Sequence, residues 1–290
     1  MGNPHELLAK ADKKAASADG GWSLFGGGSN KYEDAAELYK DAANGFRLAN
    51  LGREAGQALE KATNMQLKSG EKDDAANTLI DAFKCYRKTD PEDAIRVLEQ
   101  AVVIFTQRGG FRRAAQYKMN AAEVYENDLN DLSRAVQSYE VAGNWFSNDQ
   151  AEALANKAYL KVAELAATQE DYPKAIENFE KVGKESVNNN LTKYSTKDYF
   201  LKAGLCHLAS NDRVSAHAAL EKYQELDPTF TATRECRLLL VDLLGAIESG
   251  DEEIFSNILF DYDSLSKLDK WKTSILLKIK NNIDGEVDLT

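Results

Sequence analysis

The sequence has few of the residues that break helices or cross-link chains. Four prolines and three cysteines occur in 290 residues. Cys85, Cys206 and Cys236 form an odd, widely spaced set without a CxxC pair, which argues against a disulfide framework and favours a reducing compartment. No run of about 18 apolar residues could cross a bilayer as a helix, and the opening MGNPHELLAK lacks the pattern of a secretory signal. We therefore expect a cytoplasmic protein.

Positive charge is also in short supply. The 36 basic residues are outnumbered by 47 acidic ones, which gives a formal net charge of -11. A chain with this balance is repelled by phosphate backbones unless its cations are clustered. We expect no nucleic-acid partner.

Sequence motifs of known catalytic and metal-binding sites are missing as well. The sequence contains no HExxH, no GxSxG and no cysteine cluster with zinc spacing. Cys206 and His207 are neighbours, but adjacent helical residues point about 100° apart, so a buried thiol beside a helix-face imidazole is the simpler interpretation. Gly26 to Gly28 lack the spacing of a phosphate-binding loop. We expect no catalytic residue, no metal and no cofactor, and hence no enzyme.

What the sequence has in abundance is alanine at a regular interval. Two interleaved series advance in steps of about forty residues. They are Ala35, Ala75, Ala115 and Ala155, and Ala55, Ala94, Ala135, Ala175 and Ala216. An apolar stripe of helical period starts at these alanines and often includes an aromatic residue four positions on, as in RAVQSYEVAGNWF. These positions are expected to form the core.

Helix breakers separate the stripes about every twenty residues, as at Gly70, Asp90-Pro91 and Gly109-Gly110. One helix per twenty residues with short turns predicts antiparallel helix hairpins that stack on their neighbours. The repeat resembles the tetratricopeptide pattern, although each pair is about six residues longer. After Asp227-Pro228 the forty-residue step is lost, while the helical pattern continues.

The predicted fold class is therefore all-α: a tetratricopeptide-like solenoid of antiparallel helix hairpins capped by a C-terminal helical bundle. The expected organisation has four parts. They are an N-terminal helix with an apolar loop (1–30), the solenoid (31–227), the C-terminal bundle (228–283) and an acidic tail (284–290).

The loop is the first of three features that suggest a function. Trp22, Leu24 and Phe25 stand between Gly20-Gly21 and Gly26-Gly28. Glycine on both sides gives a flexible segment, which favours an exposed apolar tip for a membrane surface or a partner groove. The alternative is that the loop folds back and packs.

The second feature is a set of cations on an acidic chain. Members of this set include Arg87, Lys88, Arg108, Arg112, Arg113, Lys118, Lys157 and Lys161. Lys157 and Lys161 are four residues apart on one helix, where like charges cost a few tenths of a kcal/mol, so a binding role is a reasonable hypothesis. Ordinary solvated side chains are the alternative.

The third feature is an acidic C-terminal region that ends in an apolar residue. Residues 248 to 263 contain no base, and Leu289 follows further acids. The acids singled out are Glu248, Asp251, Glu252, Glu253, Asp261, Asp263, Glu286 and Asp288. Such a surface could dock on a basic partner.

Several long strings resemble one known family. They include LFGG inside the glycine-flanked loop, KTDPEDAI, GGFRRAA, ENDLNDLSRAVQSYE, ANKAYLKVA, KYSTKDYFLKAGLCHLA, TREC, KLDKW and the final DLT. Over essentially its full length the chain resembles the alpha-type soluble NSF attachment proteins, and fungal members in particular. These are adaptors used to disassemble SNARE complexes.

The resemblance implies partners and residue roles. A basic face would lie along the acidic SNARE four-helix bundle, with several copies per bundle, and the N-terminal loop would touch membrane on its cytosolic side. The C-terminal end would engage the hexameric AAA+ ATPase NSF, and Leu289 matches the leucine that stimulates its ATP hydrolysis. The implied SNARE-binding residues are Arg87, Lys88, Arg112, Lys118, Lys157 and Lys161. The implied ATPase-facing residues are Asp212, Glu248, Asp251, Glu252, Glu253, Glu286, Asp288 and Leu289.

The sequence departs from the family at some positions. Gln116 stands where some members carry lysine, and Gly245 and Ser249 stand where acids are found. A second hypothesis is a solenoid scaffold subunit of a stable cytosolic complex, without membrane or ATPase role, for which the apolar loop has no obvious use. An enzyme is a third, disfavoured by the motif survey.

Overall fold

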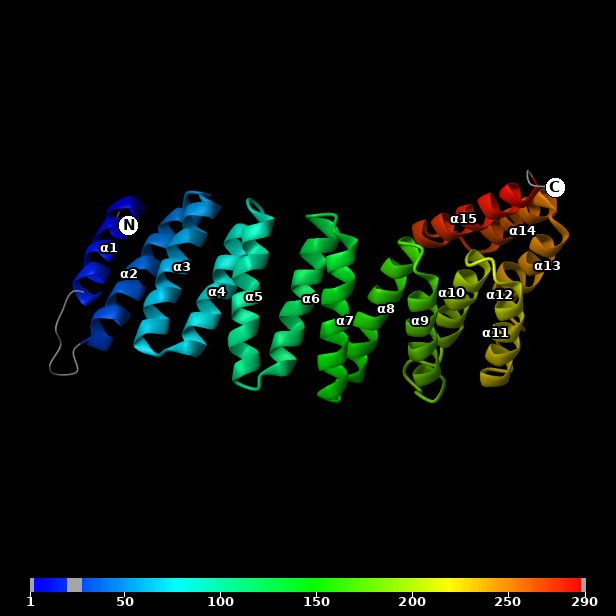
Figure 1. Ribbon diagram of the computed structural model, residues 1–290, viewed down its shortest axis with the longest axis horizontal. Helices are drawn as coiled ribbons and strands as arrows, with labels where there is room; N and C mark the ends of the chain where they lie inside the picture. Colours follow the sequence, from blue (N-terminus) through cyan, green and yellow to red (C-terminus); the bar gives the residue numbers. More distant parts are fainter. Residues whose placement is uncertain (1–2, 20–27, 288–290) are drawn as a thin grey trace. The chain divides into compact units, whose positions relative to one another are not determined.

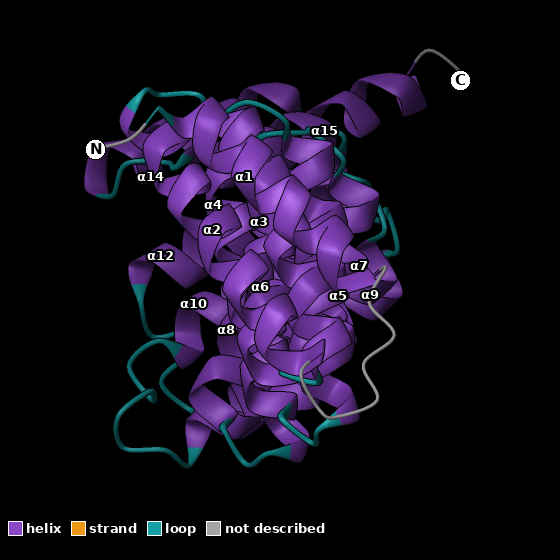
Figure 2. Cartoon of the chain, turned by 90° about the vertical axis from the view of Figure 1, so that its left-hand side faces the viewer, coloured by secondary structure: helices purple, strands orange, loops and turns teal. Residues whose placement is uncertain are grey.

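The computed structural model describes residues 3–19 and 28–287, and every regular element in these ranges is helical (Figures 1 and 2). The chain divides into two compact units, one up to Glu152 and one from Ala153 onward. The helices of the first unit are α1 (Pro4–Asp19), α2 (Gly28–Leu48), α3 (Gly52–Ser69), α4 (Lys72–Tyr86), α5 (Pro91–Gln107), α6 (Phe111–Asn127) and α7 (Leu132–Asn148).

The second unit contains the remaining helices. They are α8 (Glu152–Thr168), α9 (Tyr172–Val187), α10 (Thr196–Ala209), α11 (Arg213–Leu226), α12 (Arg234–Cys236), the π-helix η1 (Arg237–Asp242), α13 (Leu243–Ser249), α14 (Glu252–Leu265) and α15 (Lys270–Val287). The predicted all-α hairpin fold is confirmed. The four-part organisation with a boundary at residue 227 stays a prediction.

The alanines of the forty-residue series lie in the core, as predicted. In the first unit each of them is completely buried, and so are the larger side chains that follow on the same stripes. Tyr39, Phe46, Tyr139 and Phe146 are all at most 3% exposed. Small residues at the crossing points let neighbouring helices approach, while the aromatic rings fill the space beside them.

Gly56 shows how close this approach is. A Cβ atom at this position in α3 would lie 2.5 Å from the ring of Tyr86 in α4. That is closer than real Cβ atoms come to other heavy atoms. The pair α3 and α4 therefore depends on glycine for its packing distance.

The turns between helices share one backbone device. Left-handed φ values occur at Gly70, Gly109 and Gly250 and also at non-glycine residues. The non-glycine positions are Asn50, Asn130, Gln150, Glu170 and Asn211. These residues lie just after helix ends, where a left-handed residue lets the chain reverse and satisfies the last carbonyls.

The C-terminal helices of the second unit pack back on its earlier helices. α15 lies against α10 and α14, and three of its side chains bond to backbone carbonyls far away in the sequence. Trp271 Nε1 donates to the Glu164 carbonyl at 3.1 Å, Lys278 Nζ to Thr168 at 3.1 Å and Asn282 Nδ2 to Ala209 at 3.2 Å.

One helical run of this unit changes pitch. The π-helix η1 continues α12 and passes directly into α13. Leu239 and Leu240 in η1, and Leu243, Leu244 and Ile247 in α13, are buried in the core of the second unit. The wider π turn, a rare element in proteins, thus lies inside a packed segment.

Candidate functional site

The predicted basic pair Arg87 and Lys88 lies directly after α4. Arg87 is partly exposed, and its Nε lies 3.3 Å from Asp128 Oδ2. Lys88 is exposed and forms no ion pair with any residue that the structure describes. Of the two, Lys88 is the one whose charge is not compensated by an acid of the described chain.

Arg112 and Lys118 lie on α6 in different surroundings. Arg112 is 66% exposed, with Nε 3.7 Å from Asp149 Oδ2, a distance longer than a hydrogen bond. Lys118 is only 18% exposed, and its Nζ lies 2.7 Å from both carboxylate oxygens of Glu99 in α5. Lys118 thus joins two helices, which limits its use as a contact.

Lys157 and Lys161 lie on α8 in the second unit. Lys157 is exposed and pairs with no acid of the described ranges 3–19 and 28–287. Lys161 is partly exposed and already interacts with another group of the chain. Lys157 therefore offers more uncompensated charge at the surface than Lys161.

Two of the predicted ATPase-facing acids cap helices. The Asp212 carboxylate accepts from the Ser215 amide at 3.0 Å at the start of α11, and Asp251 accepts from the Ile254 amide at 2.9 Å at the start of α14. Hydrogen bonds from the Ser215 hydroxyl and amide lower the pKa of Asp212. These aspartates hold helix N-termini, a role that the sequence interpretation did not foresee.

The other acids of this end are more accessible. A carboxylate oxygen of Glu248 lies 2.6 Å from His217 Nε2, and the two side chains are 42% and 56% exposed. Glu252 and Glu253 occupy the first turn of α14, where negative charge is favoured by the helix dipole.

Several predicted residues lie outside the described part of the chain. They are Trp22, Leu24, Phe25, Asp288 and Leu289. Glu286 belongs to the last turn of α15, but its side chain also lies outside the described part.

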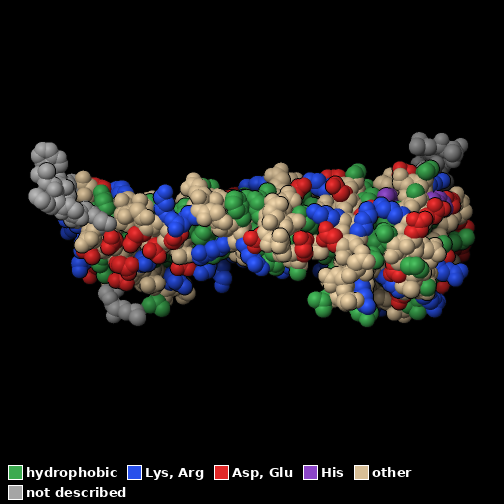
Figure 3. All heavy atoms as spheres, turned by 90° about the horizontal axis from the view of Figure 1, so that it is seen from below, with side chains coloured by type: hydrophobic (Ala, Val, Ile, Leu, Met, Phe, Trp, Pro, Cys, Tyr) green, Lys and Arg blue, Asp and Glu red, His purple; other side chains and the backbone are tan. Residues whose placement is uncertain are grey.

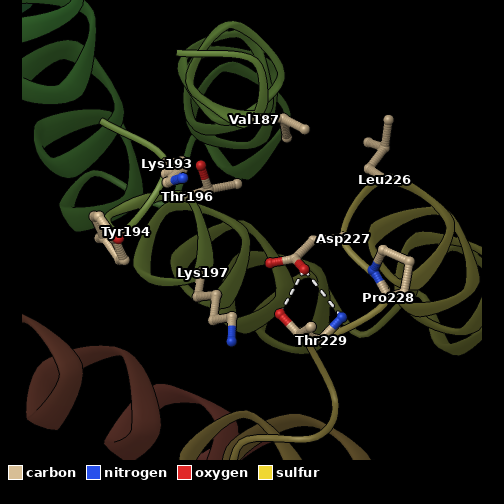
Figure 4. Close-up of a pocket in the computed structure, with 9 residues that line it drawn as sticks. All are labelled: Val187, Lys193, Tyr194, Thr196, Lys197, Leu226, Asp227, Pro228 and Thr229. Atoms are coloured by element: carbon tan, nitrogen blue, oxygen red, sulfur yellow. Dashed lines mark hydrogen bonds between the residues drawn. The ribbon is translucent and has the colours of Figure 1, made fainter. Parts of the chain in front are cut away.

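The sequence interpretation missed an exposed apolar pair. Leu191 and Tyr194, in the segment between α9 and α10, are 91% and 82% exposed. Tyr194 lines a cleft of about 360 Å³ together with Lys193 and Lys197 (Figure 4). Its Asp227 carboxylate is held by Thr229, whose hydroxyl and amide donate to it at 2.7 and 3.0 Å. The string NNNLTKYSTK, with two large apolar residues in a polar loop, could have signalled this surface.

Many cations of the chain are paired with an acid roughly one repeat away. Examples are Arg53 with Asp90, Arg96 with Glu60, Arg108 with Asp73, Arg134 with Glu92 and Lys202 with Glu164. Figure 3 shows the result, with acidic and basic side chains interleaved on the face in view. Such pairs join neighbouring hairpins, so a basic residue on this fold is not by itself a binding residue.

The described ranges contain no group of three His, Cys, Asp or Glu side chains that could hold a metal ion. Cys206 is completely buried, and burial raises the pKa of its thiol, which makes it a poor nucleophile. None of the helices in the described part is long and apolar enough to span a membrane.

The fold and these surfaces define a helical-hairpin repeat protein, and comparisons with known proteins place it further. A family model described as "Soluble NSF attachment protein, SNAP" matches residues 2–284. The "Probable vesicular-fusion protein sec17 homolog" of Schizosaccharomyces pombe is 54% identical over 291 residues, covering 100% of both chains. The "Alpha-soluble NSF attachment protein" of Saccharomyces cerevisiae is 42% identical and covers 99% of both. The human protein of the same name is 40% identical, over 97% of this chain and 94% of its own length.

The chain belongs to the soluble NSF attachment protein family. The resemblance drawn from the sequence strings is confirmed, and so is the similarity to fungal members.

Proposed function

We propose that this protein is the adaptor that binds SNARE four-helix bundles and recruits an NSF-type AAA+ ATPase to disassemble them. The observation that carries the proposal is the family match over nearly the whole chain, from residue 2 to residue 284. Relatives named for vesicular fusion and for NSF attachment are similar over the full length. This supports an adaptor without catalysis of its own rather than a scaffold subunit of a stable complex.

The SNARE-facing charge rests mainly on Lys88 and Lys157, and Lys161 contributes less because it already interacts with another group of the chain. Lys88 and Lys157 are exposed and pair with no acid of the described chain, so their full charge is available to an acidic helical bundle. Arg87 and Arg112 offer less because each has a carboxylate nearby, and Lys118 offers least because Glu99 neutralises it. In the second unit, Leu191 and Tyr194 add exposed apolar area, and Tyr194 lines a cleft with Lys193 and Lys197.

The ATPase-facing surface consists of acids at the C-terminal end of the chain. Glu248, Glu252 and Glu253 present carboxylates to a basic partner. Asp251 caps α14, the helix that carries Glu252 and Glu253, and Asp212 caps α11. Leu289, flanked by Glu286 and Asp288, supplies one apolar group. Burial of one leucine is worth about 1.5–3 kcal/mol, enough to shift a conformational equilibrium of the ATPase by about tenfold.

Membrane contact is assigned to Trp22, Leu24 and Phe25. Each of these side chains contributes about 1.5–3 kcal/mol if it is buried in lipid, so one copy binds weakly. Several copies on one SNARE bundle bind well, because the later contacts are intramolecular. The protein thus works at the cytosolic face of membranes as a peripheral protein.

A co-purification experiment tests the proposal. Immobilised SNARE bundles should retain an NSF-type ATPase only when this protein is present, and ATP with magnesium should then release the SNARE subunits. Retention of the ATPase without this protein, or failure to bind bundles at all, contradicts the proposal.

The charged face is tested by the double variant Lys157→Glu with Lys161→Glu. Bundle binding should fall by at least about tenfold, and the wild-type affinity should fall as salt rises, because exposed charges are screened. The matched control is Lys10→Glu with Lys13→Glu on α1, which makes the same charge change at exposed lysines. Equal loss in both double variants indicates a non-specific effect of net charge and contradicts the assignment.

The final leucine is tested by Leu289→Ala. This variant should bind SNARE bundles normally but lose most of its stimulation of ATP hydrolysis and disassembly. Normal ATP turnover by the variant contradicts the role of Leu289. Loss of bundle binding as well indicates a folding defect, which circular dichroism detects.

A further inference from the structure

The first unit repeatedly places a cation over an aromatic ring beside an acid. Tyr39 of α2 donates its hydroxyl to Asp12 of α1 at 2.7 Å, and Lys61 of α3 lies 2.8 Å from the same carboxylate. The Lys61 Nζ is 5.6 Å from the centroid of the Tyr39 ring. The ring face and the carboxylate thus share one cation from a neighbouring helix.

The same arrangement recurs along the unit. Lys68 lies 2.7 Å from Asp19 and 5.5 Å from the centroid of the Tyr32 ring. Arg134 of α7 lies 4.6 Å from the centroid of the Tyr125 ring and 2.6 Å from Asp131. In each case the aromatic ring, the acid and the cation belong to the chain itself.

A fourth site in this unit has aromatic rings beside an acid but no cation of the described chain over the rings. Phe111, at the start of α6, and Trp145, near the end of α7, meet edge to face with centroids 6.0 Å apart. They line a cleft of about 290 Å³ together with Gly109, Asn148 and Asp149. Phe111 is 45% exposed. Within the described part of the chain no cation lies over either ring.

The polar groups of this cleft are available. The Trp145 indole N–H and the Asn148 side-chain amide form no hydrogen bond with any described residue. The nearest cation is Arg112, whose Nε is 3.7 Å from Asp149 and whose side chain is 66% exposed. Arg112 therefore neutralises Asp149 only loosely and leaves the rings uncovered.

We propose that the cleft between Phe111, Trp145 and Asp149 binds a lysine or arginine side chain from a segment of a partner protein. The two rings would face the alkyl stem and the charged group of the bound side chain. Asp149 would pair with its charge, and the side-chain carbonyl of Asn148 would accept a hydrogen bond from it. Tryptophan is the aromatic residue that attracts cations most strongly. The inference does not depend on the adaptor function, because it follows from the cleft and from the three internal examples.

A competing occupant is an apolar side chain, which also fits between two rings. The carboxylate at the rim disfavours it, because covering Asp149 with apolar atoms removes water from a charge without replacing the lost interaction. An anionic side chain would pair with Arg112 but meet Asp149 and the negative faces of the rings.

Fluorine NMR on the full chain tests the proposal. The protein contains three tryptophans, so labelling with 5-fluorotryptophan gives few signals, and Trp145→Phe assigns the one of interest. The probes are the peptides acetyl-Ala-Lys-Ala-amide and acetyl-Ala-Arg-Ala-amide, with Gln, Leu and Glu analogues. The cationic peptides should shift the Trp145 signal with at least about fivefold higher affinity than the Gln analogue, which corresponds to about 1 kcal/mol.

Variants separate the contributions. Asp149→Asn and Phe111→Leu should each weaken the cationic peptides by at least about threefold, while Arg112→Gln should strengthen them because a competitor is removed. The matched control is Asp73→Asn, another exposed carboxylate paired with an arginine, Arg108, but outside the cleft; it should have no effect. Equal or tighter binding of the Leu or Glu peptide, an unchanged affinity in Asp149→Asn, or no shift with any peptide overturns the proposal.

Discussion

The two units of the chain bury their side chains in different ways. In the first unit each helix packs mainly on the helices next to it in sequence, from α1 with α2 to α6 with α7. In the second unit α15 lies on α10, and Trp271 bonds to the Glu164 carbonyl across 107 residues of sequence. The stability of a stack of repeats is approximately a sum over neighbours, whereas the second unit depends on contacts that close over long loops.

The two units also differ in how deeply their ion-paired side chains are buried. Most ion pairs of the first unit join two side chains that are each at least 25% exposed, and such pairs contribute little. In the second unit the Glu180 side chain is 11% exposed and lies among three donors. Tyr223 donates to it at 2.9 Å, Lys184 lies at 3.0 Å and Lys222 at 2.5 Å. Loss of one group should therefore do more damage in the second unit than in the first.

The largest effect is expected from Glu180→Gln. At neutral pH this change should lower the free energy of unfolding by about 3 kcal/mol, because Tyr223, Lys184 and Lys222 lose their bonds to a nearly buried charged acceptor. Burial raises the pKa of Glu180, but the nearby His207 and the hydrogen bonds from Lys222, Lys184 and Tyr223 lower it further, so the pKa lies below its usual range.

The pH dependence of this effect has a definite sign. Because the folded pKa is depressed, the Glu180 contribution is complete above the ordinary carboxyl pKa of about 4.3 and is lost as the pH falls below it. The difference between wild type and variant should therefore shrink in acid, as measured by urea unfolding between pH 7 and pH 3. The exposed Glu177→Gln on the same helix is the control. A similar loss in both variants, or a gap that widens in acid, contradicts the buried-charge explanation.

A smaller loss is expected from Gly56→Ala in the first unit. The new methyl group would meet the Tyr86 ring at 2.5 Å, and overpacking of this kind costs about 1–3 kcal/mol. The control is Gly245→Ala in α13, where nothing lies within 4 Å of the new atom; it should stabilise by up to about 1 kcal/mol. Thermal melts should thus move in opposite directions, and parallel shifts would show that space around the Cβ atom is not decisive.

The smallest effect on stability is expected at Asp251, which caps the N-terminus of α14 and is also proposed to contact the ATPase. Asp251→Ala should cost about 0.5–2 kcal/mol of stability, whereas Asp251→Asn should cost almost nothing because asparagine caps helices equally well. If the charge also serves the ATPase, both variants should lose ATPase stimulation to a similar extent. Normal stimulation by Asp251→Asn would show that the residue is a cap alone.

Much of the first unit follows from the sequence, because its organising rule is local. Ala35, Ala75 and Ala115 mark the helix contacts by spacing alone, and Gly70 and Gly109 mark turns by residue type. The turns at Gln150 and Glu170 adopt the same left-handed conformation without glycine. These two turns are marked in the sequence only by the neighbouring breakers Asn148-Asp149 and Asp171 to Pro173, not by the left-handed residue itself.

The candidate site was harder to predict, because pairing between helices is not visible in a periodic pattern. Lys118 and Lys157 look alike in the sequence, yet the first is held by Glu99 and the second is exposed without an acid in the described chain. Asp212 and Asp251 look like surface acids, yet both cap helices. Spacing identifies the face of a helix, but the partner across the interface comes from the three-dimensional packing.

The π-helix η1 has a consequence for how this chain can change length. A π turn holds about one residue more than an α turn, so a single deletion between Arg237 and Asp242 that restores the narrower pitch leaves the following helix facing the same way. Leu243, Leu244 and Ile247, which are buried, would stay in the core. A deletion inside α10 has no extra residue to absorb it and would rotate the rest of that helix by about 100°. Single-residue deletions should therefore be tolerated between residues 237 and 242, and not within the α-helices that form the core.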